Sequence, residues 1–276
     1  RLGALLGLAL APLAQQPSEV RAFTRSGQSF VTWRELAQPD VRYRVYRGKG
    51  PIRSIADLPN TTLIGEVDDR SSRNQGRSLA SGAESTWVIS EGAPALAQDE
   101  GLFVHTIGAP LSSVNYAVTC VIGGVESPLL PRGVKSTQSG QLEQPAAPAP
   151  VLQKADEDGE LWAHWVTNVA TPFQDALSLW PSHGFNFRFE PGTAGGAHGL
   201  VVRLHAAGQQ YAQGWPQRFE VPADVDILAL SDLQNYTSYS FWFGAQENLP
   251  ALPGADTRVS NYAQRRVLWT LDWMQA

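Results

Sequence analysis

The sequence predicts two folded regions, an antiparallel β-sandwich followed by an α/β sheet, and three observations support this. The chain has 276 residues, which is more than one typical domain needs. Its first half carries short runs of alternating apolar and polar residues, separated by Gly, Pro, Asn and Asp. Its second half joins β-branched, strand-like runs to helix-like stretches. Between the halves, residues 138–150 are rich in Ala and Pro and are expected to form a linker.

Charge and cysteine content exclude several functions. The net charge is −5 and no basic cluster is present, which argues against a nucleic-acid partner. The single cysteine, Cys120, cannot form an intrachain disulfide. It lies within the apolar run "YAVTCVI", so we expect a buried, unreactive thiol. No sequence feature calls for a cofactor.

The N-terminal residues 1–16 have the pattern of a secretory signal peptide that lacks its beginning. The stretch "RLGALLGLALAPLAQQP" runs from one positive residue through an apolar core to small residues, with cleavage expected after Ala11 or Ala14. The run is too short to span a membrane. Because the first methionine is Met274, we expect the sequence to begin inside a longer one. The expected location is therefore secreted or periplasmic, and the other interpretation is a short buried helix.

Residues 17–137 are expected to form the β-sandwich. In chain order, strands are expected over 19–25, 28–35, 41–47, 61–67, 85–90, 101–107 and 114–127. The last of these resembles a hairpin that turns at Gly123-Gly124. The long polar stretch "RSSRNQGRSLASG" is expected to be a loop. Alternation predicts a common core, made of Trp33, Tyr43, Val45, Tyr116 and Val118.

This region resembles a fibronectin type III domain. The motifs that carry the resemblance are "FVTW" on the second strand, "YRVYR" on the third and "NYAVTCVIGGVES" on the penultimate strand. Tyr116 stands where that family has its tyrosine-corner residue. The segment 50–100 is longer than in the family. The resemblance implies a sandwich that folds independently.

Residues 151–276 are expected to form the α/β sheet. Strands are expected over 159–167, 185–192, 198–208 and 225–232, the third of them buried. A helix-like stretch follows the third strand, although Gly214 and Pro216 interrupt it. A final helix is expected near the C-terminus, with Ser260 as its N-cap. This order predicts that the inner strands are parallel.

Two motifs in this region, "GLVVRLHAAGQQY" and "VDILALSDLQN", resemble the N-terminal part of an α/β-hydrolase of the esterase and prolyl-oligopeptidase type. The resemblance implies an oxyanion loop formed by His205, Ala206, Ala207 and Gly208, whose backbone N–H groups would stabilise the developing charge on a carbonyl oxygen. The motif departs from the family at Ala206, where a glycine is usual.

The nucleophile of such an enzyme would be a serine in a G-x-S-x-G motif, and the 276 residues contain none. We therefore expect the N-terminal fragment of a secreted serine hydrolase, with no catalytic residue in this chain and with nucleophile, acid and base beyond residue 276. The full-length protein would act on an ester, a peptide or a polysaccharide-linked substrate. The alternative is a secreted, non-catalytic protein that binds carbohydrate or a protein.

A few other residues are candidates for a ligand site. Asp232 follows a strand end, where α/β sheets bind ligands, although a solvated loop carboxylate is the simpler interpretation. Trp242 could line a pocket, and the simpler interpretation of this residue is core packing. The five histidines show no H-x-x-x-H or H-E-x-x-H spacing, so no metal site is expected.

Overall fold

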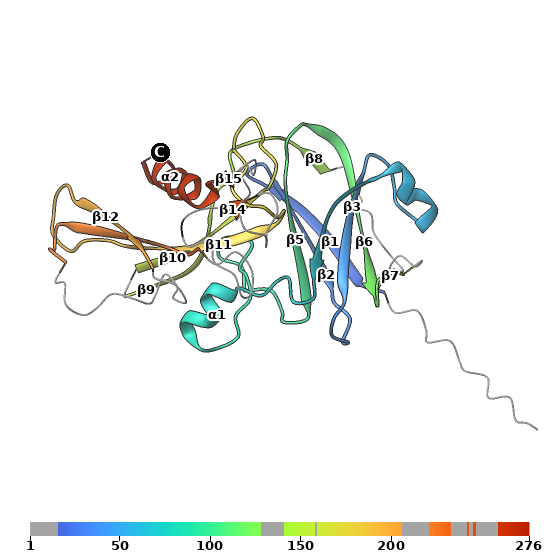
Figure 1. The fold of residues 1–276 in the computed structure, drawn as a ribbon, viewed down its shortest axis with the longest axis horizontal. Coiled ribbons are helices and arrows are strands. Elements are labelled where there is room, and N and C mark those ends of the chain that lie inside the picture. The colour runs from blue at the N-terminus through green and yellow to red at the C-terminus, as the bar shows by residue number, and fades with distance from the viewer. Residues whose placement is uncertain are drawn as a thin grey trace, which may run out of the picture.

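The computed structural model describes residues 16–127, 141–157, 159–205, 221–232, 242, 245–246 and 259–275. Within them the fold is mostly antiparallel β-sheet, arranged as a β-sandwich and a second, five-stranded sheet beside it (Figure 1). Residues 1–15 of the expected signal peptide (1–16), residues 206–208 of the expected oxyanion loop and most of the helix-like stretch after it lie outside the described residues.

The β-sandwich consists of two antiparallel sheets. The first sheet has the order β1 (Ser18–Arg25), β2 (Gln28–Arg34), β5 (Glu100–Thr106). The second has the order β4 (Thr62–Asp68), β3 (Arg42–Gly48), β6 (Leu111–Ile122), β7 (Val125–Glu126), and β8 (Gln141–Glu143) also pairs with β6. Short helices η1 (Ile55–Asn60) and α1 (Gln75–Ser81) lie in the long segment between β3 and β5.

Both sheets contribute to one apolar core, which confirms the predicted core residues. Trp33, Tyr43, Val45, Tyr116 and Val118 are all buried in it. Cys120 is buried in the same cluster as a free thiol, as predicted. The alternation of apolar residues therefore identified the inner faces of both sheets.

The predicted turn at Gly123-Gly124 is also confirmed. It joins β6 to β7, and both glycines have left-handed backbone angles, with φ of +59° and +82°. Two consecutive positive φ values are what a two-residue hairpin turn needs, and glycine adopts them without strain.

The strand β2 is buried on both faces. The alternation within 28–35 instead indicates a strand with one face in the core and one in solvent. Val31 and Trp33 point into the sandwich core, whereas Phe30 joins a second cluster with Trp165 of the other sheet. The outer face of the β1–β2–β5 sheet is therefore an interface. The strand expected over 85–90 does not form, and that stretch contributes Trp87 to this interface instead.

The second sheet has the order β12 (Gly199–Leu204), β13 (Val225–Leu230), β11 (His183–Glu190), β10 (Gly159–Val166), β9 (Val151–Asp156). Only β12 and β13 are parallel, so the expectation of parallel inner strands is wrong for the rest of the sheet. The strand β12 lies at the edge, and Leu200, Val201 and Leu204 are 42%, 38% and 48% exposed. It is not the buried strand that was predicted.

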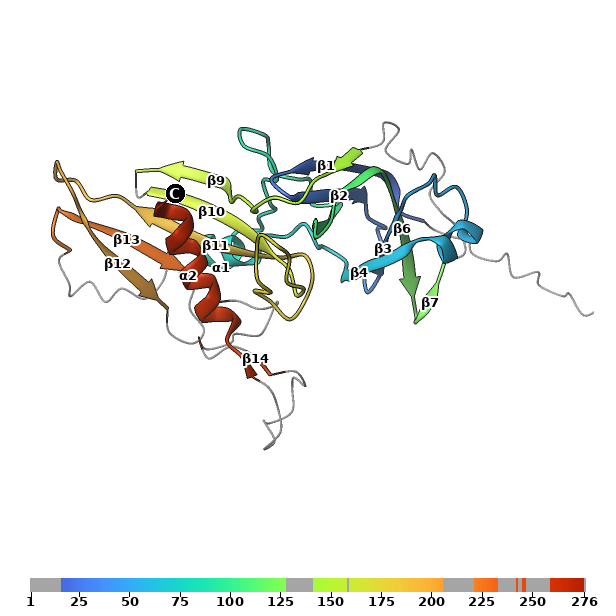
Figure 2. The ribbon, with the colours of Figure 1, turned by 90° about the horizontal axis from the view of Figure 1, so that it is seen from above.

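The two faces of the second sheet are covered differently (Figures 1 and 2). Helix α2 (Tyr262–Gln275) packs on one face, where Phe187, Leu228 and Leu230 meet its Leu271. The other face carries α1 and the sandwich, through Trp165 and Leu161. A small antiparallel pair, β14 (Ala245–Gln246) and β15 (Val259–Ser260), precedes α2.

The helices correct two expectations. The polar stretch expected to be a loop contains α1, which Asn74 caps by accepting the N–H of Arg77. Ser260 belongs to β15, and Asn261 accepts the N–H of Gln264 at the start of α2 with a distance of 3.0 Å. The cap of α2 therefore lies one residue later than predicted. Of the described residues, none belongs to a helix long and apolar enough to cross a membrane.

The stretch expected to be a linker is bound to the sandwich over part of its length. Strand β8 extends the sheet beside β6, and the Glu143 side chain is fully buried. Glu143 accepts hydrogen bonds from Arg47, Ser29 and Tyr116. Pro and Ala composition does not reveal such an anchor, because it depends on one carboxylate meeting donors from three distant strands.

Candidate functional site

The candidate site lies where the parallel strands β12 and β13 end. Parallel strands bring their carboxyl ends to the same edge of a sheet, and ligands of α/β sheets bind there. His205 follows β12 directly, and Asp232 lies two residues after β13. Both side chains are buried, at 7% and 0% exposure.

His205 links the two strand ends. Its Nε2 accepts the backbone N–H of Asp232 at 2.9 Å. A nitrogen that accepts a hydrogen bond carries no proton in the neutral ring, so this contact favours the tautomer protonated at Nδ1. The histidine side chain is thus held by the backbone of the neighbouring strand end.

Trp242 completes the arrangement from a different segment. Its indole N–H donates to the carbonyl oxygen of His205 at 3.0 Å, and its backbone N–H donates to Oδ2 of Asp232 at 3.1 Å. Its ring also meets the His205 ring edge to face, with centroids 5.1 Å apart. Trp242 has a φ of +64°, a left-handed conformation that is rare for a large side chain. These contacts hold it there.

Asp232 forms a buried ion pair with α2. The Arg266 guanidinium donates to Oδ1 of Asp232 at 2.7 Å and lies 3.6 Å from the centre of the Phe185 ring. Burial lowers the pKa of Arg266 to about 10, while the charge of Asp232 opposes that effect. The guanidinium therefore stays charged near neutral pH. The pair fixes α2 against the carboxyl end of β13.

The structure brings together His205, Asp232 and Trp242, which the sequence suggested separately. Ala206, Ala207 and Gly208 lie outside the described residues. Sequence reasoning missed Arg266, because a single arginine in an amphipathic helix is usually a surface charge. The available signal was its helical spacing, because Arg266 lies three residues after Ala263 and four before Thr270 and so falls on the apolar stripe of the helix.

This cluster is built to position backbone rather than to react. Asp232 is held by an arginine and an amide, and His205 by amide and indole N–H groups at its ring and carbonyl. The chain leaves β12 at a fixed point, immediately before the residues expected to form the oxyanion loop. The described residues contain no group of three or more His, Cys, Asp or Glu side chains placed to hold a metal ion.

Comparison with known proteins gives no further assignment: no family model, no curated protein and no solved structure matches this chain.

Proposed function

We propose that this chain is the N-terminal part of a secreted or periplasmic serine hydrolase that carries a β-sandwich as an accessory region. The observation that carries the proposal is the pair of parallel strands β12 and β13 with His205 and Asp232 joined at their carboxyl ends. In an α/β-hydrolase, the loop after the third strand supplies a backbone N–H to the oxyanion hole. That loop would begin at the residue after His205.

The order of strands supports the same proposal. Strands β10 and β11 are antiparallel neighbours. Strand β12 lies at the edge of the sheet, and β13 lies between β11 and β12. An α/β-hydrolase sheet starts with four strands in this order, so the analogy rests on topology as well as on the motifs. Helix α2 follows β13 and covers one face, as a helix that leads to a nucleophile strand would.

The chemistry expected of the loop is electrostatic. When a serine attacks an ester or amide carbonyl, the carbonyl oxygen becomes negative, and backbone N–H groups stabilise that charge. A preorganised donor contributes about 3–4 kcal/mol to lowering the barrier. The contacts of Asp232 and Trp242 with His205 would provide the rigidity that such a donor needs.

The experiment starts from the gene beyond codon 276. We expect a G-x-S-x-G motif within about 30 further residues, and hydrolysis of a p-nitrophenyl ester by the longer protein. In that protein, Ala207→Pro removes one N–H donor and is expected to lower kcat by about 10²–10³-fold. Ala207→Ser keeps the donor and is expected to lose far less. A stop codon after 276, or equal activities of the two variants, would contradict the proposal.

A second candidate is a secreted protein that binds carbohydrate or a protein without catalysis. A cavity between the sandwich and the second sheet favours it, because aromatic and polar side chains line that cavity. The absence of a G-x-S-x-G motif in the longer gene, with saccharide binding by this chain, would select this candidate.

A further inference from the structure

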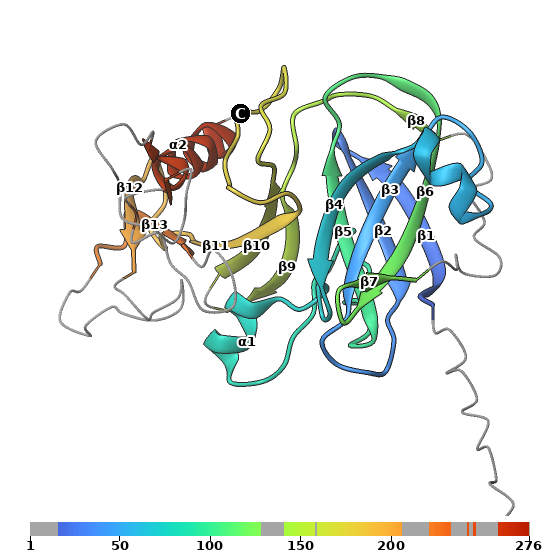
Figure 3. The same cartoon turned by 45° about the vertical axis from the view of Figure 1, so that its right-hand side comes forward.

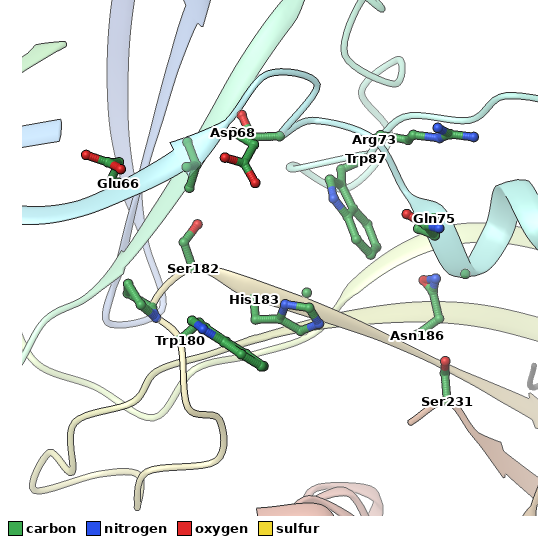
Figure 4. Close-up of a pocket in the computed structure, with 15 residues that line it drawn as sticks. Glu66, Asp68, Arg73, Gln75, Trp87, Trp180, Ser182, His183, Asn186 and Ser231 are labelled. Atoms are coloured by element: carbon green, nitrogen blue, oxygen red, sulfur yellow. The ribbon is translucent and has the colours of Figure 1, made fainter. Parts of the chain in front are cut away.

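A cavity of about 310 Å³ lies between the sandwich and the second sheet. Its lining comes from the end of β4, the α1 segment, Trp87, the start of β11 and Ser231, so both regions build it. Figure 3 shows the backbone of β4, α1 and β11, and Figure 4 shows the lining side chains. This volume is at the lower end of the range of small-molecule sites, which is roughly 300–1,000 Å³. It fits one small ring better than an extended chain.

Aromatic rings form opposite sides of the cavity. Figure 4 shows Trp87 on one side and Trp180 and His183 on the other. Trp87 is nearly buried and is held edge to face against Trp165, with ring centroids 5.3 Å apart. Trp180 is 37% exposed, unusually open for so large an apolar ring. These rings give the cavity apolar walls on which a flat apolar face of a ligand can pack.

Polar groups surround the remaining sides. Asp68, Gln75 and Asn186 point toward the cavity from three different segments (Figure 4). A carboxylate accepts hydrogen bonds, an amide both accepts and donates, and the imidazole of His183 can do either. Such a set suits a ligand that presents several hydroxyl groups.

The charges around the cavity are largely balanced within the protein. Glu66 is paired with Arg42 and Arg44, and Arg73 lies 3.7 Å from Glu84. Among the described residues, Asp68 takes part in no ion pair. An unpaired carboxylate repels an anion, and choline tests for a cation below. The aromatic rings and amide groups of the lining suit a neutral ligand that donates a hydrogen bond to Asp68.

The walls are fixed before any ligand arrives. Asn74 and Asn186 exchange two amide hydrogen bonds, at 3.1 and 2.7 Å, and so tie α1 to β11. Gly184 allows the close approach of Trp87, since a Cβ at this position would lie 2.9 Å from the Trp87 ring. A preformed cavity loses little conformational entropy on binding.

We infer that this cavity binds a neutral pyranose sugar, stacked between Trp87 and Trp180 with its hydroxyl groups on Asp68, Gln75 and His183. The apolar faces of a pyranose ring match the aromatic walls, and its hydroxyl groups match the polar rim. The inference goes beyond the proposed hydrolase and does not rest on it, because the described residues build the cavity without the oxyanion loop. Ser231 also lines the cavity, one residue before Asp232, so the sugar would bind beside the candidate site.

The test measures binding of four neutral probes to the full chain by calorimetry and by saturation-transfer NMR. The probes are the methyl β-glycosides of glucose, galactose, xylose and N-acetylglucosamine. We expect at least one of them to bind with a millimolar or lower Kd, which is usual for a single ring in a small site. Choline and trialanine serve as cationic and peptide probes.

The location is tested with substitutions. Trp180→Ala is expected to weaken binding of the best probe about tenfold, because it removes one stacking surface. Asp68→Asn is expected to weaken it by a similar factor of about ten, since a hydrogen bond to a charged acceptor is lost. Both side chains are exposed, so the fold should survive. Phe173→Ala is the matched control, since Phe173 is 50% exposed and does not line the cavity.

Three outcomes would overturn the inference. They are no binding of any neutral probe at millimolar concentration, binding of choline or trialanine alone, and equal affinity of Trp180→Ala and Phe173→Ala for the sugar. Esterase activity of a longer protein is a separate measurement, so failure of the sugar site and failure of the hydrolase proposal are distinguishable.

Discussion

The sandwich and the second sheet each bury a carboxylate, but they use it differently. In the sandwich, Glu143 accepts hydrogen bonds from Arg47, Tyr116 and Ser29. These bonds hold β8 against strands β2, β3 and β6. In the second sheet, Asp232 receives bonds from Arg266 and the backbone of Trp242, at the carboxyl end of a parallel strand. The first cluster closes a structural element, and the second organises the edge where a ligand site is expected.

The edges of the two regions differ as well. The outer edge of β5 in the sandwich is covered, because the N–H groups of Leu102 and Val104 donate to Ser71 and Ser182. The edge strand β12 instead presents three exposed apolar side chains, and no described strand pairs with its outer side. Proteins usually protect such an edge from pairing with other chains. Under the proposed function, the outer side of β12 is where a further parallel strand would lie.

The largest expected effect concerns the interface that unites the two regions. Trp165 is fully buried and contacts both Phe30 and Trp87. Trp165→Ala should lower the free energy of unfolding by about 4–5 kcal/mol, because it leaves a large cavity. Trp180→Ala is the control and should cost less than about 1 kcal/mol, since exposed substitutions have small effects. Equal costs in urea unfolding would mean that the regions do not depend on this interface.

The next effect tests the buried ion pair of the second sheet. Asp232→Ala leaves the Arg266 charge buried without its partner, at 4% exposure of the arginine side chain. The expected cost is about 3–4 kcal/mol in the free energy of unfolding. Asp99→Ala removes the carboxylate of an exposed pair and should cost less than about 1 kcal/mol. Similar costs for the two variants would contradict the role given to Asp232.

The corresponding change in the sandwich should be milder. Hydrogen bonds from Arg47 and Tyr116 hold the pKa of Glu143 below its usual value, although burial alone would raise it. In Glu143→Gln, Arg47 retains 20% exposure and can be hydrated. The expected loss is about 2 kcal/mol, measured by the same unfolding experiment. If Glu143→Gln lowered the free energy of unfolding more than Asp232→Ala does, the buried carboxylate of the sandwich would be the more important of the two for stability.

The smallest effect is a pH dependence in the sandwich. Burial lowers the pKa of His105 to about 4, against the opposing charge of Glu143. The unfolded chain binds a proton at this residue below pH ~6.5, whereas the folded protein does not. Stability is therefore lost as the pH falls from about 6.5 toward 4, by about 1–2 kcal/mol at pH 5. The comparison of wild type with His105→Gln isolates this contribution, and parallel stability curves would contradict it.

A second buried histidine, His164 in the second sheet, behaves in the same way as His105. Burial, together with the charge of Arg266, lowers the pKa of His164 well below its usual value. Its Nε2 lies 2.8 Å from the side-chain nitrogen of Gln174, and its ring stacks on Trp269. Glu35 has the opposite effect on the pH dependence of stability, because burial raises its pKa to about 7. The folded protein therefore binds a proton at Glu35 more readily than the unfolded chain, and lowering the pH favours the folded state. The total pH profile is thus a sum of opposing contributions.

Local patterns predicted much of the strand structure. The sandwich strands and their core follow from alternation within single strands, which depends only on neighbouring residues. The helix α1 was missed because its seven residues contain no apolar stripe and depend on Asn74 as a cap. The burial of both faces of β2 was missed because Phe30 meets a partner far away in the chain.

The candidate site was predictable only in part. Strand ends bring His205 and Asp232 to one edge, so both could be suggested from the sequence. The partner of Asp232 is 34 residues away on a helix, and the cavity walls come from four separate stretches of the chain. Neither the ion pair nor the cavity can be recognised from a local sequence pattern, because the residues involved are far apart in the chain.

The most direct test of the central claim is covalent labelling of the longer protein with a serine-directed phosphonate, followed by mass spectrometry of the labelled peptide. The account predicts one labelled serine, within a G-x-S-x-G motif beyond residue 276, and much slower labelling in the Ala207→Pro variant. Labelling of a serine within residues 1–276, or no labelling of the longer protein, would contradict it.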